Sequence, residues 1–127
     1  MSDILEADVG KALIVFGVAH KGEDEERLIG KCAALKDFAC EAERIAIEEF
    51  GVGESLALCT CNRVEFYFAG LPENFHESKR GCVKKILLEC GLETSDAERF
   101  IKTAFVLEGA DALGHLFSVA GGLESQI

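Results

Sequence analysis

One cysteine in the segment L-C-T-C-N-R-V-E-F-Y, residues 58–67, has neighbours suited to covalent chemistry. Cys61 lies between Thr60 and Asn62, and Arg63 follows two residues later. The thiolate is the nucleophilic form of cysteine, and a nearby cation raises the thiolate fraction at neutral pH. We therefore predict that Cys61 is a nucleophile and that Arg63 is its neighbouring cation. The alternative is a structural cysteine at the end of a strand.

The residues around this cysteine suggest how a ligand would be held. Thr60 can donate a hydrogen bond, and the planar guanidinium of Arg63 suits a two-point contact with a carboxylate. The alternative for Arg63 is a surface ion pair with Glu65, which lies on the same face of an extended strand. Cys59 forms a Cys-x-Cys pair with Cys61, which raises metal and redox alternatives. Two thiols and one histidine fall short of the four ligands of a structural zinc site, so no metal is predicted.

Three ordered motifs resemble those of the glutamyl-tRNA reductase family. The segment around Cys61 resembles its Ser-Thr-Cys-Asn-Arg-x-Glu-[Ile/Val]-Tyr signature, and residues 17–21, G-V-A-H-K, resemble its Gly-[Leu/Ile/Val]-x-His-Lys. Residues 115–125, H-L-F-S-V-A-G-G-L-E-S, are similar to its His-Leu-Phe-x-Val-Ala-[Ser/Ala]-Gly-Leu-[Asp/Glu]-Ser. The chain departs from the family at Cys59, where serine is usual, and at residues 22–24, G-E-D, where Thr-Ala-Pro is usual.

The resemblance implies a reaction for these residues. Cys61 would attack the ester that joins glutamate to the 3′ end of tRNA, and NADPH would reduce the resulting thioester to glutamate-1-semialdehyde for tetrapyrrole synthesis. His115 would be the active-site histidine, either a proton shuttle or a polar wall of the pocket. The substrate-binding residues that the resemblance implies are Thr60, Arg63 and Ser125, with His20 and Lys21 as secondary members of the pocket.

Hydrophobic patterning predicts an α+β fold. Residues 12–19 are typical of a buried strand, residues 23–50 of a short helix followed by a longer one, and residues 55–59 and 63–69 of a hairpin with Cys61 at its turn. A helix over 73–90, a strand over 100–107 and a helix over 110–120 follow. This order matches the ferredoxin-like split β-α-β-β-α-β fold, with helices on one face of an antiparallel sheet and an additional C-terminal helix.

The 127 residues are enough for one domain. The resemblance identifies residues 1–127 as the N-terminal catalytic domain of a longer, homodimeric reductase whose NADPH-binding and dimerisation domains are absent from this chain. No G-x-G-x-x-G follows a strand, so NADPH is not expected to bind here. The alternative function is a non-catalytic ferredoxin-like interaction or regulatory module. With no signal peptide and no apolar run long enough for a bilayer, we expect a cytoplasmic protein without membrane partners.

The net charge of −10 disfavours tight binding of this chain to nucleic acid, including DNA. One basic cluster opposes this trend, and a solvated helix face is favoured over an RNA contact for its members, Lys79, Arg80, Lys84 and Lys85. Of the six cysteines, we expect four to be reduced, buried, small apolar side chains, namely Cys32, Cys40, Cys82 and Cys90.

Overall fold

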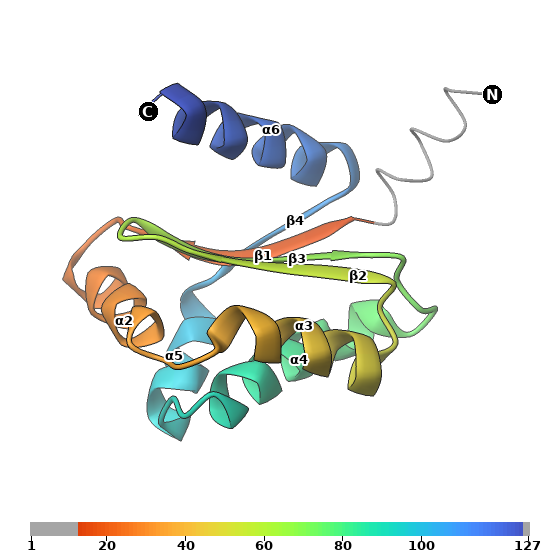
Figure 1. Cartoon of the computed structure of the whole chain (residues 1–127), viewed down its shortest axis with the longest axis horizontal. Coiled ribbons are helices and arrows are strands. Elements are labelled where there is room, and N and C mark those ends of the chain that lie inside the picture. Colours follow the sequence, from red (N-terminus) through yellow and green to blue (C-terminus); the bar gives the residue numbers. More distant parts are fainter. Residues whose placement is uncertain (1–12, 126–127) are drawn as a thin grey trace.

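A four-stranded antiparallel sheet forms the centre of the protein (Figure 1). The computed structural model describes residues 13–125, with the side chains of residues 13–121. The strands are β1 (Ile14–Ala19), β2 (Glu54–Cys59), β3 (Arg63–Ala69) and β4 (Phe105–Glu108), and their order in the sheet is β2-β3-β1-β4. β1 and β3, which carry two of the three motifs, therefore lie side by side in the middle of the sheet.

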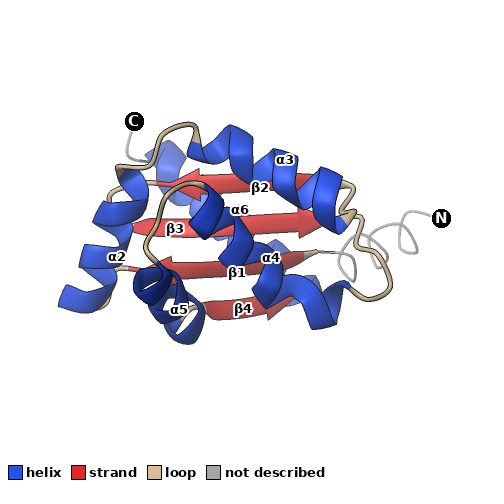
Figure 2. Ribbon diagram, turned by 90° about the horizontal axis from the view of Figure 1, so that it is seen from below, coloured by secondary structure: helices blue, strands red, loops and turns tan. Residues whose placement is uncertain are grey.

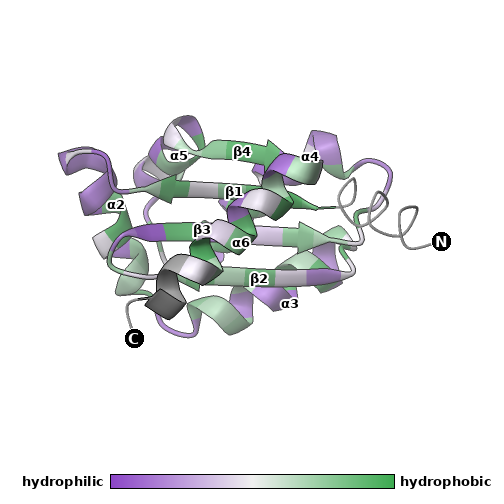
Figure 3. Ribbon diagram, turned by 90° about the horizontal axis from the view of Figure 1, so that it is seen from above, coloured by the Kyte–Doolittle hydropathy of each residue, from purple (hydrophilic) through white to green (hydrophobic). Residues whose placement is uncertain are grey.

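Helices cover both faces of this sheet. Four helices pack on one face, as Figure 2 shows from below: α2 (Glu23–Ala33), α3 (Phe38–Phe50), α4 (Phe75–Glu89) and α5 (Thr94–Thr103). The fifth helix of the described residues, α6 (Gly109–Ser125), crosses the opposite face (Figure 3). The third motif is thus brought over the sheet from the side that the other helices leave open. None of the helices within residues 13–125 has the length and apolar composition needed to cross a bilayer.

The structure confirms the α+β class, the antiparallel sheet and the hairpin, and corrects one strand. The strand predicted over residues 100–107 is wrong in its first half, because residues 100–103 belong to α5 and the strand runs only from Phe105 to Glu108. Ala97 and Phe100 are both fully buried in α5. Their separation of three residues places them on one helical face, so Phe100 contributes to a helix and not to an alternating strand.

Alternation along the strands divides the apolar residues between two cores. On the face of α2 to α5, Phe66 packs edge-on against Phe38, with ring centroids 5.5 Å apart, and against Phe100, with centroids 6.0 Å apart. On the face of α6, a smaller cluster contains the buried Val15 and Tyr67. Side chains of β3 at even-numbered positions therefore face the large core, and those at odd-numbered positions face α6.

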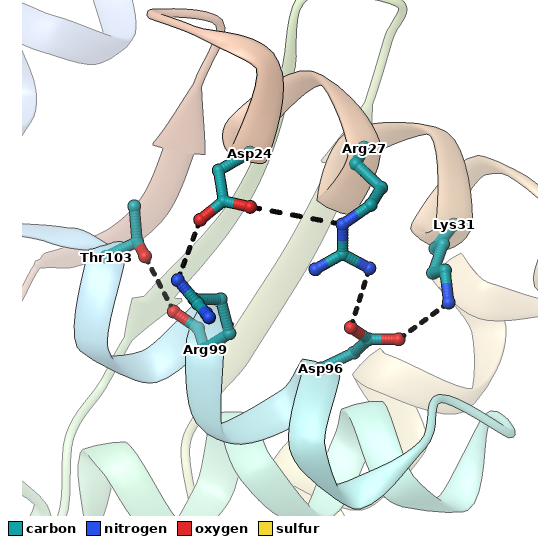
Figure 4. A network of polar contacts seen from close by, with 6 residues as sticks. All are labelled: Asp24, Arg27, Lys31, Asp96, Arg99 and Thr103. Carbon is teal, nitrogen blue, oxygen red and sulfur yellow. Dashed lines mark hydrogen bonds and ion pairs between the residues drawn. The ribbon is translucent and has the colours of Figure 1, made fainter.

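An ion-pair network joins helix α2 with helix α5 (Figure 4). Asp96 is 5% exposed and accepts hydrogen bonds from Lys31 Nζ at 2.9 Å and Arg27 Nη1 at 2.8 Å. These bonds, that from Lys31 first, hold the pKa of the Asp96 carboxyl below its usual range. Arg99 of α5 also pairs with Asp24 of α2, at 2.8 Å. Because α2 begins directly after the His20-Lys21 motif, this network also restrains the loop that carries it.

The four structural cysteines do not all behave as predicted. Cys32 and Cys82 are buried, and burial raises the pKa of each thiol to about 12. Cys90 is half-buried, and burial raises its pKa as well. The prediction is wrong for Cys40, which is exposed. The buried residues of α3 are Phe38, Ala42, Ile45 and Ala46, which share one face of the helix, and Cys40 lies on the outer side.

The basic cluster on α4 binds groups of the protein itself. Lys79 pairs with Glu108 at 3.1 Å, Lys84 pairs with Glu98 at 3.5 Å, and Lys85 pairs with Glu49. Arg80 donates to a backbone carbonyl of α5 at 3.5 Å. These contacts favour the solvated helix face over an RNA-binding surface.

Candidate active site

Cys61 lies at the tip of the β2–β3 hairpin and is exposed. The turn is closed by the Thr60 N–H, which donates to the Arg63 carbonyl at 2.9 Å. The Asn62 N–H donates to the Thr60 hydroxyl oxygen at 3.1 Å, which holds the Thr60 side chain in the turn. That hydroxyl keeps its own proton for another acceptor. The short connection thus presents the thiol to solvent between two fixed strands.

The loop after β1 contacts this turn directly. The His20 N–H donates to the Asn62 carbonyl at 2.8 Å, so the first motif and the cysteine motif meet at one end of the sheet. The His20 side chain is exposed, with Nε2 at 3.5 Å from Glu26 Oε2, and Lys21 is also exposed. The backbone therefore places both residues beside the Cys61 turn, while the structure shows the His20 imidazole against α2.

A buried carboxylate lies behind the turn on the face of α6. Glu65 is 0% exposed, and its Oε2 is 3.3 Å from Arg63 Nη1. The same oxygen is 2.5 Å from Nε2 of His115, which belongs to α6. Arg63 and His115 therefore converge on one oxygen atom from a strand and from a helix.

The third motif reaches this carboxylate because α6 crosses the sheet and contacts β4 and β1, the strand beside β3. The His115 ring packs edge-on against Phe105 of β4, with ring centroids 5.2 Å apart. Both Glu65 and Phe105 pair in register with Gly17 of β1. A Cβ atom at Gly17 would lie 2.9 Å from Glu65 Cγ, so the glycine leaves the space that the buried carboxylate occupies.

Glu65 is the site residue that the sequence analysis missed as a functional group. The alternative predicted for Arg63, an ion pair with Glu65, is formed, but not at the surface, because the carboxylate of Glu65 is fully buried. A signal for this was present in the sequence, since Glu65 interrupts an otherwise apolar strand with a side chain that alternation directs to a covered face. An acid at such a position needs partners, and Arg63 and His115 are two of them.

Cys59 lies on the other face of the sheet from Glu65. It is half-buried beside Phe38 and Cys32 under α2 and α3, and burial raises the pKa of its thiol. Among the described residues, no three histidine, cysteine or acidic side chains gather as a metal site would require. Ser125 is the last residue of α6, and its side chain lies outside the part that the structure describes.

The fold and the site define a class of protein: a small α+β domain that presents a cysteine at a hairpin turn beside an arginine held by a buried acid. Residues 18–127 match a family model described as the N-terminal domain of glutamyl-tRNA(Glu) reductase. The chain belongs to this family.

Individual relatives agree with this assignment. The chain is 32% identical over 115 residues to a glutamyl-tRNA reductase of Methanopyrus kandleri, covering 91% of this chain and 23% of the relative. It is 37% identical over 115 residues to a glutamyl-tRNA reductase of Thermus thermophilus, covering 91% of this chain and 24% of the relative. The solved structure of the Methanopyrus kandleri reductase matches with a TM-score of 0.55 and 31% identity, covering 90% of this chain and 23% of that one. The chain thus spans about a quarter of the length of these relatives.

Proposed function

We propose that this domain binds the glutamyl group of glutamyl-tRNA and forms a thioester with it through Cys61, as a step of tetrapyrrole biosynthesis. The observation that carries the proposal is the convergence of the motifs. Cys61 is exposed at a turn, and the neighbouring Arg63 shares one carboxylate oxygen with His115 from the far end of the chain. We also assign the sheet order β2-β3-β1-β4 to the ferredoxin-like split βαβ pattern.

The chemistry would proceed by acyl transfer. The Cys61 thiolate attacks the carbonyl carbon of the aminoacyl ester, a C–S bond forms, and the C–O bond to the tRNA ribose breaks. The departing ribose oxygen takes up a proton, for which His115 is the proposed shuttle. Arg63 would hold the free carboxylate of the glutamyl group through its guanidinium, while Thr60 would donate its hydroxyl proton to the substrate.

Each protein contact has a proposed contribution to this step. The buried Glu65 would restrain the guanidinium of Arg63 through Nη1 and leave its other N–H groups for a ligand. Holding the glutamyl group by one end while the ester lies near Cys61 would make the attack effectively unimolecular. Ser125, His20 and Lys21 are proposed to complete the pocket.

The described residues do not fit an NADPH site. No strand-to-helix connection within residues 13–125 carries the G-x-G-x-x-G loop that cradles a pyrophosphate. NADPH would supply a hydride to the thioester in the full-length enzyme, which we propose to be a cytoplasmic homodimer. We assign no part of that step to residues of this domain.

Single-turnover acylation tests the proposal. The domain is mixed with tRNA carrying radiolabelled glutamate, and the acid-stable protein label is measured with and without hydroxylamine, which cleaves thioesters. Wild type and Cys59→Ser should become labelled, and Cys61→Ser should not. Equal labelling of Cys61→Ser and wild type would refute the assignment of the nucleophile.

A further inference from the structure

The two oxygens of the Glu65 carboxylate have different partners. Oε2 is shared by Arg63 and His115, whereas Oε1 accepts a hydrogen bond of 2.6 Å from the Tyr67 hydroxyl. Tyr67 is two residues further along β3, is 4% exposed and packs in the small core under α6. Protein groups thus contact both oxygens of this carboxylate, which is buried from solvent.

The donor on Oε1 is a rigid one. A tyrosine side chain has two rotatable bonds, and the packed core under α6 restrains the ring of Tyr67. Burial, and then the hydrogen bond to Glu65, raises the pKa of Tyr67, so its hydroxyl is protonated and donates at neutral pH. A carboxylate fixed at one oxygen by such a donor cannot rotate without losing that hydrogen bond.

We propose that Tyr67 is a positioning residue for substrate binding, which acts by holding Glu65 so that the opposite oxygen faces Arg63 and His115. This inference rests on the proposed function, because it assigns the orientation of the Arg63 fork to the capture of the glutamyl carboxylate. Gly17 belongs to the same arrangement, since it provides the space in which Glu65 lies. Tyr67 itself does not need to touch the substrate.

Removing only the hydroxyl separates this role from core packing. Tyr67→Phe keeps the ring in the core under α6 but leaves Oε1 without its donor. Val15→Ala is the matched control. Val15 of β1 pairs with Tyr67 of β3 and belongs to the same cluster, so this substitution removes packing around Tyr67 but leaves its hydroxyl in place. Tyr67 is the only tyrosine and the chain has no tryptophan, so tyrosine emission reports this one residue.

The first measurement asks whether the hydrogen bond exists in solution. A carboxylate that accepts a hydrogen bond from the phenol hydroxyl quenches tyrosine emission, so Glu65→Gln should increase the emission of Tyr67 relative to wild type. Unchanged emission in a folded Glu65→Gln variant would overturn the inference at its first step.

The second measurement is the dependence of Cys61 acylation on glutamyl-tRNA concentration. We expect Tyr67→Phe to raise the half-saturating concentration about tenfold, the effect of losing one charge-assisted hydrogen bond, with the maximum rate changed less than about twofold. Val15→Ala should lower the melting temperature and leave the half-saturating concentration unchanged. If wild type forms a thioester and Tyr67→Phe saturates at the wild-type concentration, the inference is overturned and the proposed function stands. If wild type forms none, the proposed function fails and the inference fails with it.

Discussion

Adding one methyl group at Gly17 should disturb the centre of the site. Gly17 pairs with Glu65 of β3 on one side and with Phe105 of β4 on the other. In Gly17→Ala the new Cβ would lie 2.9 Å from Glu65 Cγ, 2.9 Å from the Val64 carbonyl oxygen and 3.1 Å from Phe105 Cζ. All three distances are shorter than ordinary van der Waals contact, so neighbouring atoms must move.

The loss of unfolding free energy depends on how far the neighbouring atoms can move. The Val64 carbonyl belongs to the backbone of the β1–β3 ladder, and Glu65 is held by its three side-chain partners. Overpacking of this kind costs typically about 1–3 kcal/mol of unfolding free energy. For a domain of this size each kcal/mol lowers the melting temperature by about 4 °C. The displaced Glu65 should also weaken glutamyl-tRNA binding.

Urea unfolding and thermal melting of the purified domain measure the effect. Gly81→Ala is the matched control, because Gly81 lies inside α4 and nothing lies within 4 Å of its added Cβ. Alanine in a helix interior is favoured over glycine by about 1 kcal/mol, so this variant should be stabilised. If Gly17→Ala unfolds at the same urea concentration as wild type or above it, the close packing argument for Gly17 is wrong.

Three further changes test other parts of the structure. Iodoacetamide at neutral pH should label the exposed Cys61 rapidly. It should label Cys32 and Cys82 only after unfolding, because burial raises the pKa of each of these thiols to about 12. Labelling of all three cysteines at one rate in the folded protein would contradict this. The hydrogen bond from Lys31, more than that from Arg27, lowers the pKa of Asp96 in the folded protein. The ionised Asp96 therefore stabilises the fold above its unfolded pKa of about 4, and this stabilisation is lost as the pH falls through the folded pKa. Urea midpoints measured from pH 6 to pH 2 should therefore fall more steeply for wild type than for Asp96→Asn, and parallel curves would rule out this contribution. Calorimetric titration with NADPH should show no saturable binding to the domain, and micromolar affinity would contradict the assignment of the hydride step to another part of the enzyme.

The fold was predictable where local pattern and tertiary packing agree. The buried strand β1, the paired helices before Gly51 and the hairpin around Cys61 follow from apolar spacing and turn residues. The error lay between residues 94 and 107, where α5 and β4 are adjacent. The burial of Ala97 and Phe100 on one face identifies a helix there and not a strand, and that burial depends on packing against α2 and α4.

The candidate site follows from its motifs, whereas its geometry could not be predicted from the sequence. Thr60, Cys61 and Arg63 are close because they are close in sequence, and the contact of His20 with the turn follows from two adjacent central strands. The position of His115 could not be derived in this way, because α6 packs on the face opposite to the other helices. The burial of Glu65 depends on that same crossing, so the acid is recognisable as a site residue only once α6 is placed.

The acidic charge can now be related to the proposed substrate. Of the 12 lysines and arginines whose side chains the structure describes, eight form ion pairs with carboxylates of the same chain, namely Arg27, Lys31, Arg44, Arg63, Lys79, Lys84, Lys85 and Arg99. The carboxylate already offsets part of the charge of each such cation, so these cations gain less from RNA than unpaired ones would. In the Arg63 pair, Glu65 is 0% exposed and contacts the guanidinium at one nitrogen, Nη1, so other N–H groups of Arg63 remain for a ligand. Under the proposed function, we therefore expect this domain to recognise the glutamyl end of the substrate more than the tRNA body.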